Sequence, residues 1–209
     1  CYLGCQTAPQ VPICGLAVEK SEGIVHSMNS ALCAKVATAV VFVLGPFEPL
    51  PGQGAEAPPP AKSPRAGEEV TLPAGRIVAR AYLALPKAPG PHPGILISPE
   101  WWGHNDFVRM RADMLATLGY AALAMDLYGN GKKAHDPQTA ARLDGALKGN
   151  QKEMNARVLA HLKFLVGRPE VDGDAIAAIG YGSGGDVCLQ MARNGMRRLD
   201  GVVAFHPFF

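Results

Sequence analysis

The chain has 209 residues, enough for one folded domain with its own core and additional residues at an end. Hydrophobic residues make up 48% of it and charged residues 18%, which is ordinary for a globular enzyme. The formal net charge is only +2, so charge gives no reason to expect binding to nucleic acid or to an anionic membrane surface.

The five cysteines form neither a CxxC pair nor a Cys/His spacing typical of a zinc site. Three of them lie in the first 14 residues, and Cys33 sits in an apolar run. Cys188 stands alone in the C-terminal part, where we interpret it as a small buried hydrophobic residue on a helix. We therefore expect no metal.

The N-terminal part has the pattern of a secretory signal over residues 28–57. Met28 and one lysine precede the apolar run 36–44, and Ala-Glu-Ala at 55–57 matches a cleavage site. The run is too short to span a bilayer comfortably. A signal would place the protein in the periplasm or outside the cell, with residues 1–27 as upstream sequence of uncertain status. The alternative is a loosely packed extension on a cytoplasmic protein.

Residues 58–67 are rich in proline and predict an extended linker. The folded domain is expected over 68–209. Alternation begins at Val70, residues 77–85 predict a strand, and the short apolar run 94–98 predicts a buried parallel strand.

Helical and strand patterns alternate after this point. The first helix is capped by Asn105 or Asp106 and ends before Gly119. The further predictions are strands at 120–125, 175–179 and 201–205, and helices at 137–149, up to Leu165 and up to Arg193.

Such alternation with short connections predicts an α/β fold, with parallel strands, right-handed crossovers and helices on both faces of the sheet. In such sheets the site lies at the carboxyl ends of the strands. Here those ends are residues 98–103, 126–129, 180–185 and His206.

The segment Gly180-Tyr181-Gly182-Ser183-Gly184-Gly185 follows a predicted buried strand and opens a predicted helix. This context is typical of a nucleophile elbow, a strained turn that needs small residues around its tip. The alternative is a dinucleotide-binding turn, with Gly180, Gly182 and Gly185 as its glycines. That motif should follow the first strand of a fold, whereas this one follows a late strand. We therefore expect no cofactor.

Four segments resemble the dienelactone hydrolase family in order and spacing: Pro99–Asp106, Gly119–Gly129, Val171–Tyr181 and Gly201–His206. The resemblance covers residues from about 76 to 209. It implies an α/β-hydrolase fold, hydrolysis of carboxylic esters or lactones of small molecules through an acyl-enzyme, no cofactor or metal, and a monomeric complete enzyme.

The family pattern Gly-x-Cys-x-Gly-Gly places the nucleophile at Gly182, which has no side chain. Glu100 matches the glutamate that helps to deprotonate the nucleophile. Either the turn is shifted by one residue to present Ser183, or the nucleophile is missing and the Ser183 and Trp101 amides remain as oxyanion donors. The bulk of Tyr181 argues against the shift.

The resemblance also implies pocket walls formed by Trp101, Trp102, Tyr128 and Tyr181, although at least one tryptophan could simply belong to the core. Lys132 and Lys133 follow Tyr128 and are interpreted as solvated loop charges rather than a carboxylate site.

The family places an aspartate and a histidine of its triad after the strand corresponding to 201–205, and this chain reaches only Phe209. His206 is expected to be structural, while Asp126 and Asp186 lie in the wrong segments for the triad acid. We therefore expect a C-terminally incomplete, inactive hydrolase domain, since a triad without its base and acid loses most of its rate advantage. The alternative is a non-catalytic binding module with a hydrolase fold.

Overall fold

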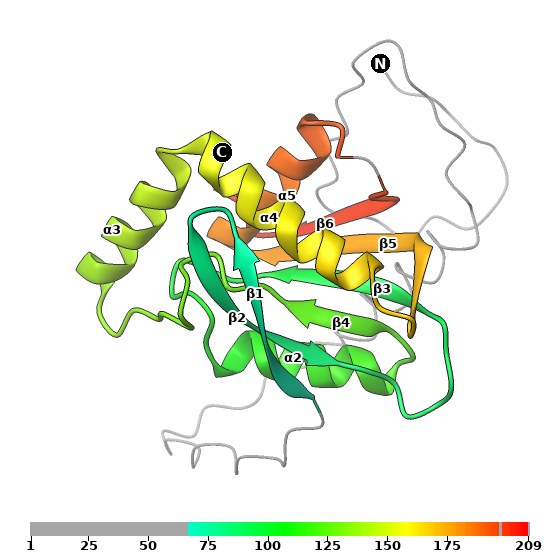
Figure 1. The fold of residues 1–209 in the computed structure, drawn as a ribbon. Helices are drawn as coiled ribbons and strands as arrows, with labels where there is room; N and C mark the ends of the chain where they lie inside the picture. The colour runs from blue at the N-terminus through cyan, green and yellow to red at the C-terminus, as the bar shows by residue number, and fades with distance from the viewer. Residues whose placement is uncertain (1–66, 197, 209) are drawn as a thin grey trace, which may run out of the picture.

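The computed structural model describes residues 67–196 and 198–208 (Figure 1). The predicted upstream segment 1–27 and signal segment 28–57 lie outside the described residues. So does the predicted linker, except for Gly67.

Strands and helices alternate along most of the described part of the chain, as predicted. The order is β1 (Glu68–Ala74), β2 (Ile77–Ala84), β3 (His92–Ser98), α2 (Asp106–Thr117), β4 (Ala121–Ala124), α3 (Pro137–Lys148), α4 (Gln151–Val166), β5 (Val171–Tyr181), α5 (Ser183–Arg193) and β6 (Gly201–Phe205). The strands form one six-stranded sheet in the order β1-β2-β4-β3-β5-β6.

The sheet is mixed. β3, β4, β5 and β6 pair in parallel, as expected for strands linked by helical crossovers. β1 pairs with β2 and β2 with β4 in antiparallel fashion. The two-residue turn Gly75–Arg76 requires the first pairing, because strands joined so tightly cannot run parallel.

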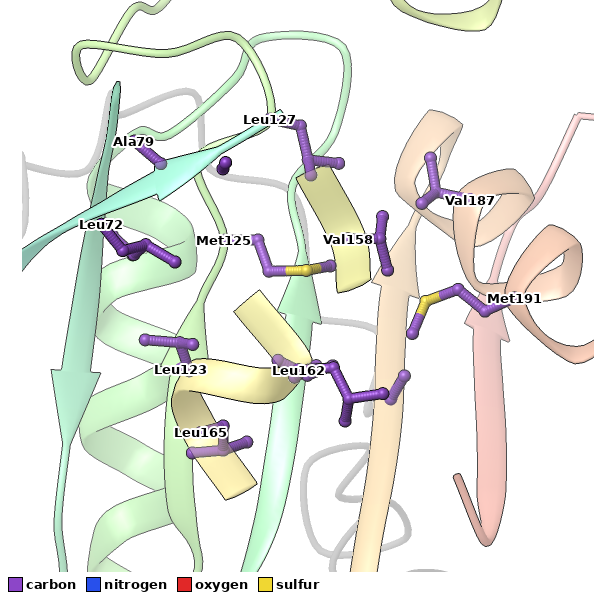
Figure 2. Packing of buried hydrophobic residues seen from close by; sticks show 14 of the residues in the cluster. Leu72, Ala79, Leu123, Met125, Leu127, Val158, Leu162, Leu165, Val187 and Met191 are labelled. Atoms are coloured by element: carbon purple, nitrogen blue, oxygen red, sulfur yellow. The ribbon is translucent and has the colours of Figure 1, made fainter. Parts of the chain in front are cut away.

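Helices cover both faces of this sheet. α2 packs on β4 and β2, whereas α4 and α5 pack on β1, β5 and β6 from the other side, and α3 contacts α4 (Figure 1). Two buried clusters correspond to the two faces. In the larger one, Leu123 and Met125 lie near Leu162 of α4, and Met191 of α5 extends the cluster (Figure 2). No helix in the described residues is long and apolar enough to cross a membrane.

Cys188 is fully buried in α5 within the larger cluster, which confirms its interpretation as a small core residue. Burial raises the pKa of its thiol, so the group stays protonated and unreactive.

Side-chain caps start three of the helices. The Oδ1 atoms of Asn105, Asp136 and Asn150 accept hydrogen bonds from first-turn amides of α2, α3 and α4. Gly119, with a φ of 92°, follows α2 as predicted. α5 differs, because its N-cap residue is Gly182 and no side chain caps it.

Candidate active site

The turn between β5 and α5 has a backbone conformation that favours glycine. Gly182 has a φ of 50° and a ψ of −120°, a region that residues with side chains rarely adopt. Its N–H donates a hydrogen bond of 2.7 Å to the Phe205 carbonyl of β6. The tip of the turn is therefore fixed to the end of the neighbouring strand.

Steric contacts show which residue lies at the tip. A Cβ added at Gly180 would lie 2.2 Å from the Gly184 oxygen, and one at Gly184 would lie 2.3 Å from the Pro99 oxygen. Side chains are thus excluded two positions before and two positions after Gly182. A turn centred on Ser183 would need the same exclusion at Tyr181, which carries a ring. The structure centres the turn on Gly182.

Ser183 opens α5, and its side chain is buried. Its hydroxyl donates a hydrogen bond to Asp144 of α3. Lys148 Nζ lies 3.1 Å from Asp144 Oδ2 and 2.7 Å from Asp186 Oδ2. The Ser183 hydroxyl is thus part of a polar contact between α3 and α5.

Our sequence reasoning missed Asp144 and Lys148 as partners of the turn. Their spacing of four residues on a predicted helix was the available signal, since such pairs share a helix face. Their contact with α5 depends on how the helices pack against each other, which cannot be predicted from a local sequence pattern.

Glu100 lies beside the tip of the turn. A Cβ on Gly182 would be 3.8 Å from Glu100 Cγ and 4.0 Å from its carboxyl carbon. Phe208 is the other neighbour, with its Cε2 atom 3.6 Å away. These are ordinary van der Waals distances, so a side chain at position 182 would fit the space and meet the Glu100 carboxylate. Phe208 is 70% exposed, and no pattern in the sequence predicted that it lies beside Gly182.

Tyr128 holds the loop that carries Glu100. Its hydroxyl donates a hydrogen bond of 2.9 Å to the Trp101 carbonyl. Burial, with a smaller contribution from the nearby charge of Asp144, raises the pKa of Tyr128. The phenol therefore stays protonated and remains a donor.

Three backbone contacts hold the same loop. Gly103 N–H donates to the Glu100 carbonyl at 2.8 Å, and Ala134 N–H donates to the Trp102 carbonyl at 2.9 Å. Gly103 also forms an antiparallel bridge with Lys133. The position of Glu100 thus depends on the segment after β4 as well as on β3.

The four predicted pocket aromatics separate into two groups. The rings of Trp101 and Trp102, both half-buried, meet edge to face with centroids 5.3 Å apart, in the loop held by Tyr128. The Tyr181 ring stacks on Phe205 at 5.0 Å within the core cluster on the α2 face. Tyr181 therefore has a packing role in this structure.

Asp126 is fully buried and organises the loop after β4. Its carboxylate accepts hydrogen bonds from the N–H groups of Arg80, Gly129 and Gly131 at 2.9, 2.8 and 2.7 Å. Because these bonds use both oxygens, Asp126 has a structural role. Among the described residues, no group of three or more acidic, histidine or cysteine side chains is arranged to hold a metal.

The remaining candidates lie at the surface. Lys132, Lys133 and His206 are all exposed. His206 has a φ of 50° just after β6. Within the described part of the chain, no ion pair or side-chain hydrogen bond ties any of the three to Glu100.

A mixed sheet with a parallel part from β4 to β6, covered by helices on both faces, with a strained strand-to-helix turn at its carboxyl edge, defines an α/β-hydrolase fold. The family model for the dienelactone hydrolase family matches residues 79–209, well over half of the chain. The chain belongs to the dienelactone hydrolase family.

Two relatives illustrate this relationship. The structure of a dienelactone hydrolase-like promiscuous phosphotriesterase from metagenomic libraries has 34% sequence identity and a TM-score of 0.63, covering 68% of this chain and 59% of that one. Human mitochondrial acyl-coenzyme A thioesterase 2 is 33% identical over 119 residues, which are 56% of this chain and 21% of the thioesterase. The chain thus spans about a fifth of the length of that curated relative.

Proposed function

We propose that the described region binds carboxylic esters or lactones of small molecules at the Glu100–Gly182 edge, and that the chain forms no acyl-enzyme there. The observation that carries this proposal is glycine at the tip of the strained turn, next to the Glu100 carboxylate. Nucleophilic catalysis requires a side chain at the tip that a base can activate. Gly182 provides none.

The chemistry of the site supports an acyl substrate. The first amides of α5 have no acceptor within the helix, and the helix N-terminus favours a developing negative charge. The two half-buried tryptophans offer apolar surface for a small organic molecule. One relative is named as an acyl-coenzyme A thioesterase, which is a hydrolase of acyl compounds.

Restoring the nucleophile tests the proposal. Gly182→Cys places a thiol next to Glu100, and we expect it to form an acyl-cysteine with p-nitrophenyl acetate, detected as a mass increase of the intact protein. The double variant Gly182→Cys, Glu100→Gln should acylate more slowly. Gly145→Cys, on α3, is the matched control for an added thiol. Acylation of the wild-type chain, or none in Gly182→Cys, would contradict the proposal.

The second candidate is a binding module that has no hydrolytic activity at all. The missing side chain of Gly182 favours it. It predicts that an unreactive lactam or phosphonate analogue of a small ester binds the wild-type chain in a calorimetric titration. Glu100→Gln should change the affinity, whereas Glu68→Gln, an exposed change on β1, should not.

We further propose export through the predicted signal segment 28–57, and a monomeric complete enzyme. N-terminal sequencing of protein recovered from outside the cytoplasm tests the first, with a new N-terminus just after residue 57 as the expected result. Light scattering tests the second.

A further inference from the structure

We propose that Glu100 activates a water molecule beside Gly182, so that the chain hydrolyses activated esters directly at a low rate. The inference rests on the proposed function, because it uses the same site and the same class of substrate. It adds a reaction that needs no nucleophilic side chain.

The space for the water is defined by the glycine. The atoms nearest to a Cβ at position 182 are Phe208 Cε2 at 3.6 Å and Glu100 Cγ at 3.8 Å. Glu100 Cδ lies 4.0 Å away, so the carboxyl group borders this space. A water that lies between the turn and this carboxylate can donate a hydrogen bond to it, which is the contact that a general base needs.

The backbone keeps this arrangement without a side chain. Gly182 N–H is bound to Phe205 O, and Gly185 N–H donates to Gly182 O at 2.9 Å. The turn therefore stays in its strained form, with the amide of Ser183 at the start of α5. This amide has no intrahelical acceptor and is suited to bind an oxyanion that forms beside the turn.

The reaction balances without any further reagent. The water oxygen bonds to the ester carbonyl carbon while one water proton moves to the Glu100 carboxylate. The carbonyl electron pair moves to oxygen, and the α5 amide binds this oxyanion. When the tetrahedral species collapses, the carbon–alkoxide bond breaks and Glu100 returns the proton to the leaving oxygen. The products are an acid and an alcohol.

The expected rate is modest. General-base catalysis contributes about 10²–10⁴-fold, and an oxyanion donor adds about 10²–10³-fold. Without a covalent intermediate, only esters with good leaving groups, such as p-nitrophenyl acetate, are expected to react measurably.

Hydrolysis of p-nitrophenyl acetate by the full chain tests the proposal. The wild type should release p-nitrophenol linearly, without a burst, more slowly in D₂O, and with no acyl adduct in the intact mass. Glu100→Gln should reduce the enzymatic rate at least tenfold while its circular dichroism stays unchanged. The control Glu68→Gln should keep the wild-type rate.

Several outcomes would overturn the water route. These are a burst, an acyl adduct on Ser183 or another side chain, an unchanged rate in Glu100→Gln, or no hydrolysis by the wild type. If Gly182→Cys still forms an acyl-cysteine in such a case, the proposed function stands and only the water route fails. If Gly182→Cys is also unreactive, both fail.

Discussion

Gly182 combines a left-handed φ of 50° with open space around its missing side chain. Gly182→Ala should therefore destabilise the fold through backbone strain, by about 1–3 kcal/mol. Urea unfolding measures the change. Gly145→Ala, in the middle of α3 with nothing within 4 Å of the added Cβ, should instead stabilise by about 0.5–1 kcal/mol. Equal effects of both changes would show that φ at position 182 is not strained.

The neighbouring glycines are constrained by contact as well. A methyl group at Gly180 or Gly184 would lie within 2.3 Å of a backbone oxygen. Gly180→Ala and Gly184→Ala should therefore unfold at clearly lower urea concentrations than Gly182→Ala. Gly201→Ala, where the added Cβ meets nothing within 4 Å, is the matched control. If Gly184→Ala proved as stable as this control, the turn would not be centred on Gly182.

The sequence predicted the turn but left open which residue lies at its tip. A tip at Gly182 has Gly180 and Gly184 two positions away, whereas a tip at Ser183 has Gly185 on one side and Tyr181 on the other. The decisive contact joins Gly184 to the carbonyl of Pro99, which lies at the end of another strand. The Asp144 partner of Ser183 likewise comes from a different helix. Such contacts arise from packing between elements and have no local pattern.

Among the elements, the loop that carries Glu100 depends on Tyr128. Tyr128→Phe removes the hydrogen bond to the Trp101 carbonyl and should cost about 0.5–1.5 kcal/mol. Amide hydrogen exchange should become faster at residues 99–104 and stay unchanged in β1. Tyr120→Phe is a comparable loss of a buried phenol oxygen elsewhere and should not change exchange at 99–104. Uniformly faster exchange would contradict a local role for Tyr128.

The contact between α3 and α5 depends on Lys148. Burial opposes its charge, yet hydrogen bonds with Asp186 and Asp144 raise the pKa of Lys148 overall. Lys148→Met leaves two partly buried carboxylates without a cation and should destabilise by about 1–3 kcal/mol in urea unfolding. Lys152→Met, an exposed change on α4, should be nearly neutral. A neutral result for Lys148→Met would show that the ion pairs contribute little.

Most elements were predictable because their signals are local. The caps Asn105 and Asp136, the stop at Gly119 and the apolar run of β6 each depend on a few adjacent residues. The antiparallel pairing of β2 with β4 was not predictable, because it joins strands separated by a whole β–α unit. The docking of α3 on α5 is of the same kind.

For the whole molecule, two buried histidines predict acid sensitivity. His104 Nε2 accepts a hydrogen bond from Arg109 Nε, so the ring is neutral with its proton on Nδ1. Burial, reinforced by the Arg109 charge, lowers the pKa of His104 to about 4. His161, whose Nε2 accepts from Asp126 N–H, has a pKa lowered in the same direction by burial.

His104 is therefore protonated below about pH 6.5 in the unfolded state, but only below about pH 4 in the folded state. The contribution of neutral His104 to the free energy of unfolding should be complete above pH 6.5. It should decrease between these two pH values, by up to about 3 kcal/mol. Urea unfolding at pH 7.5 and pH 5 measures the difference. His104→Gln should be less stable at pH 7.5 and lose less on acidification. An unchanged pH dependence in that variant would contradict the role of His104.

The two tryptophans of the chain are adjacent, and both lie in the loop that carries Glu100. All indole emission of the protein therefore originates at its candidate site. The edge-to-face pair also couples the two indole transitions, so the near-ultraviolet circular dichroism of the molecule reports on the geometry of this loop. Ligand binding at the site can thus be observed optically in the unlabelled protein.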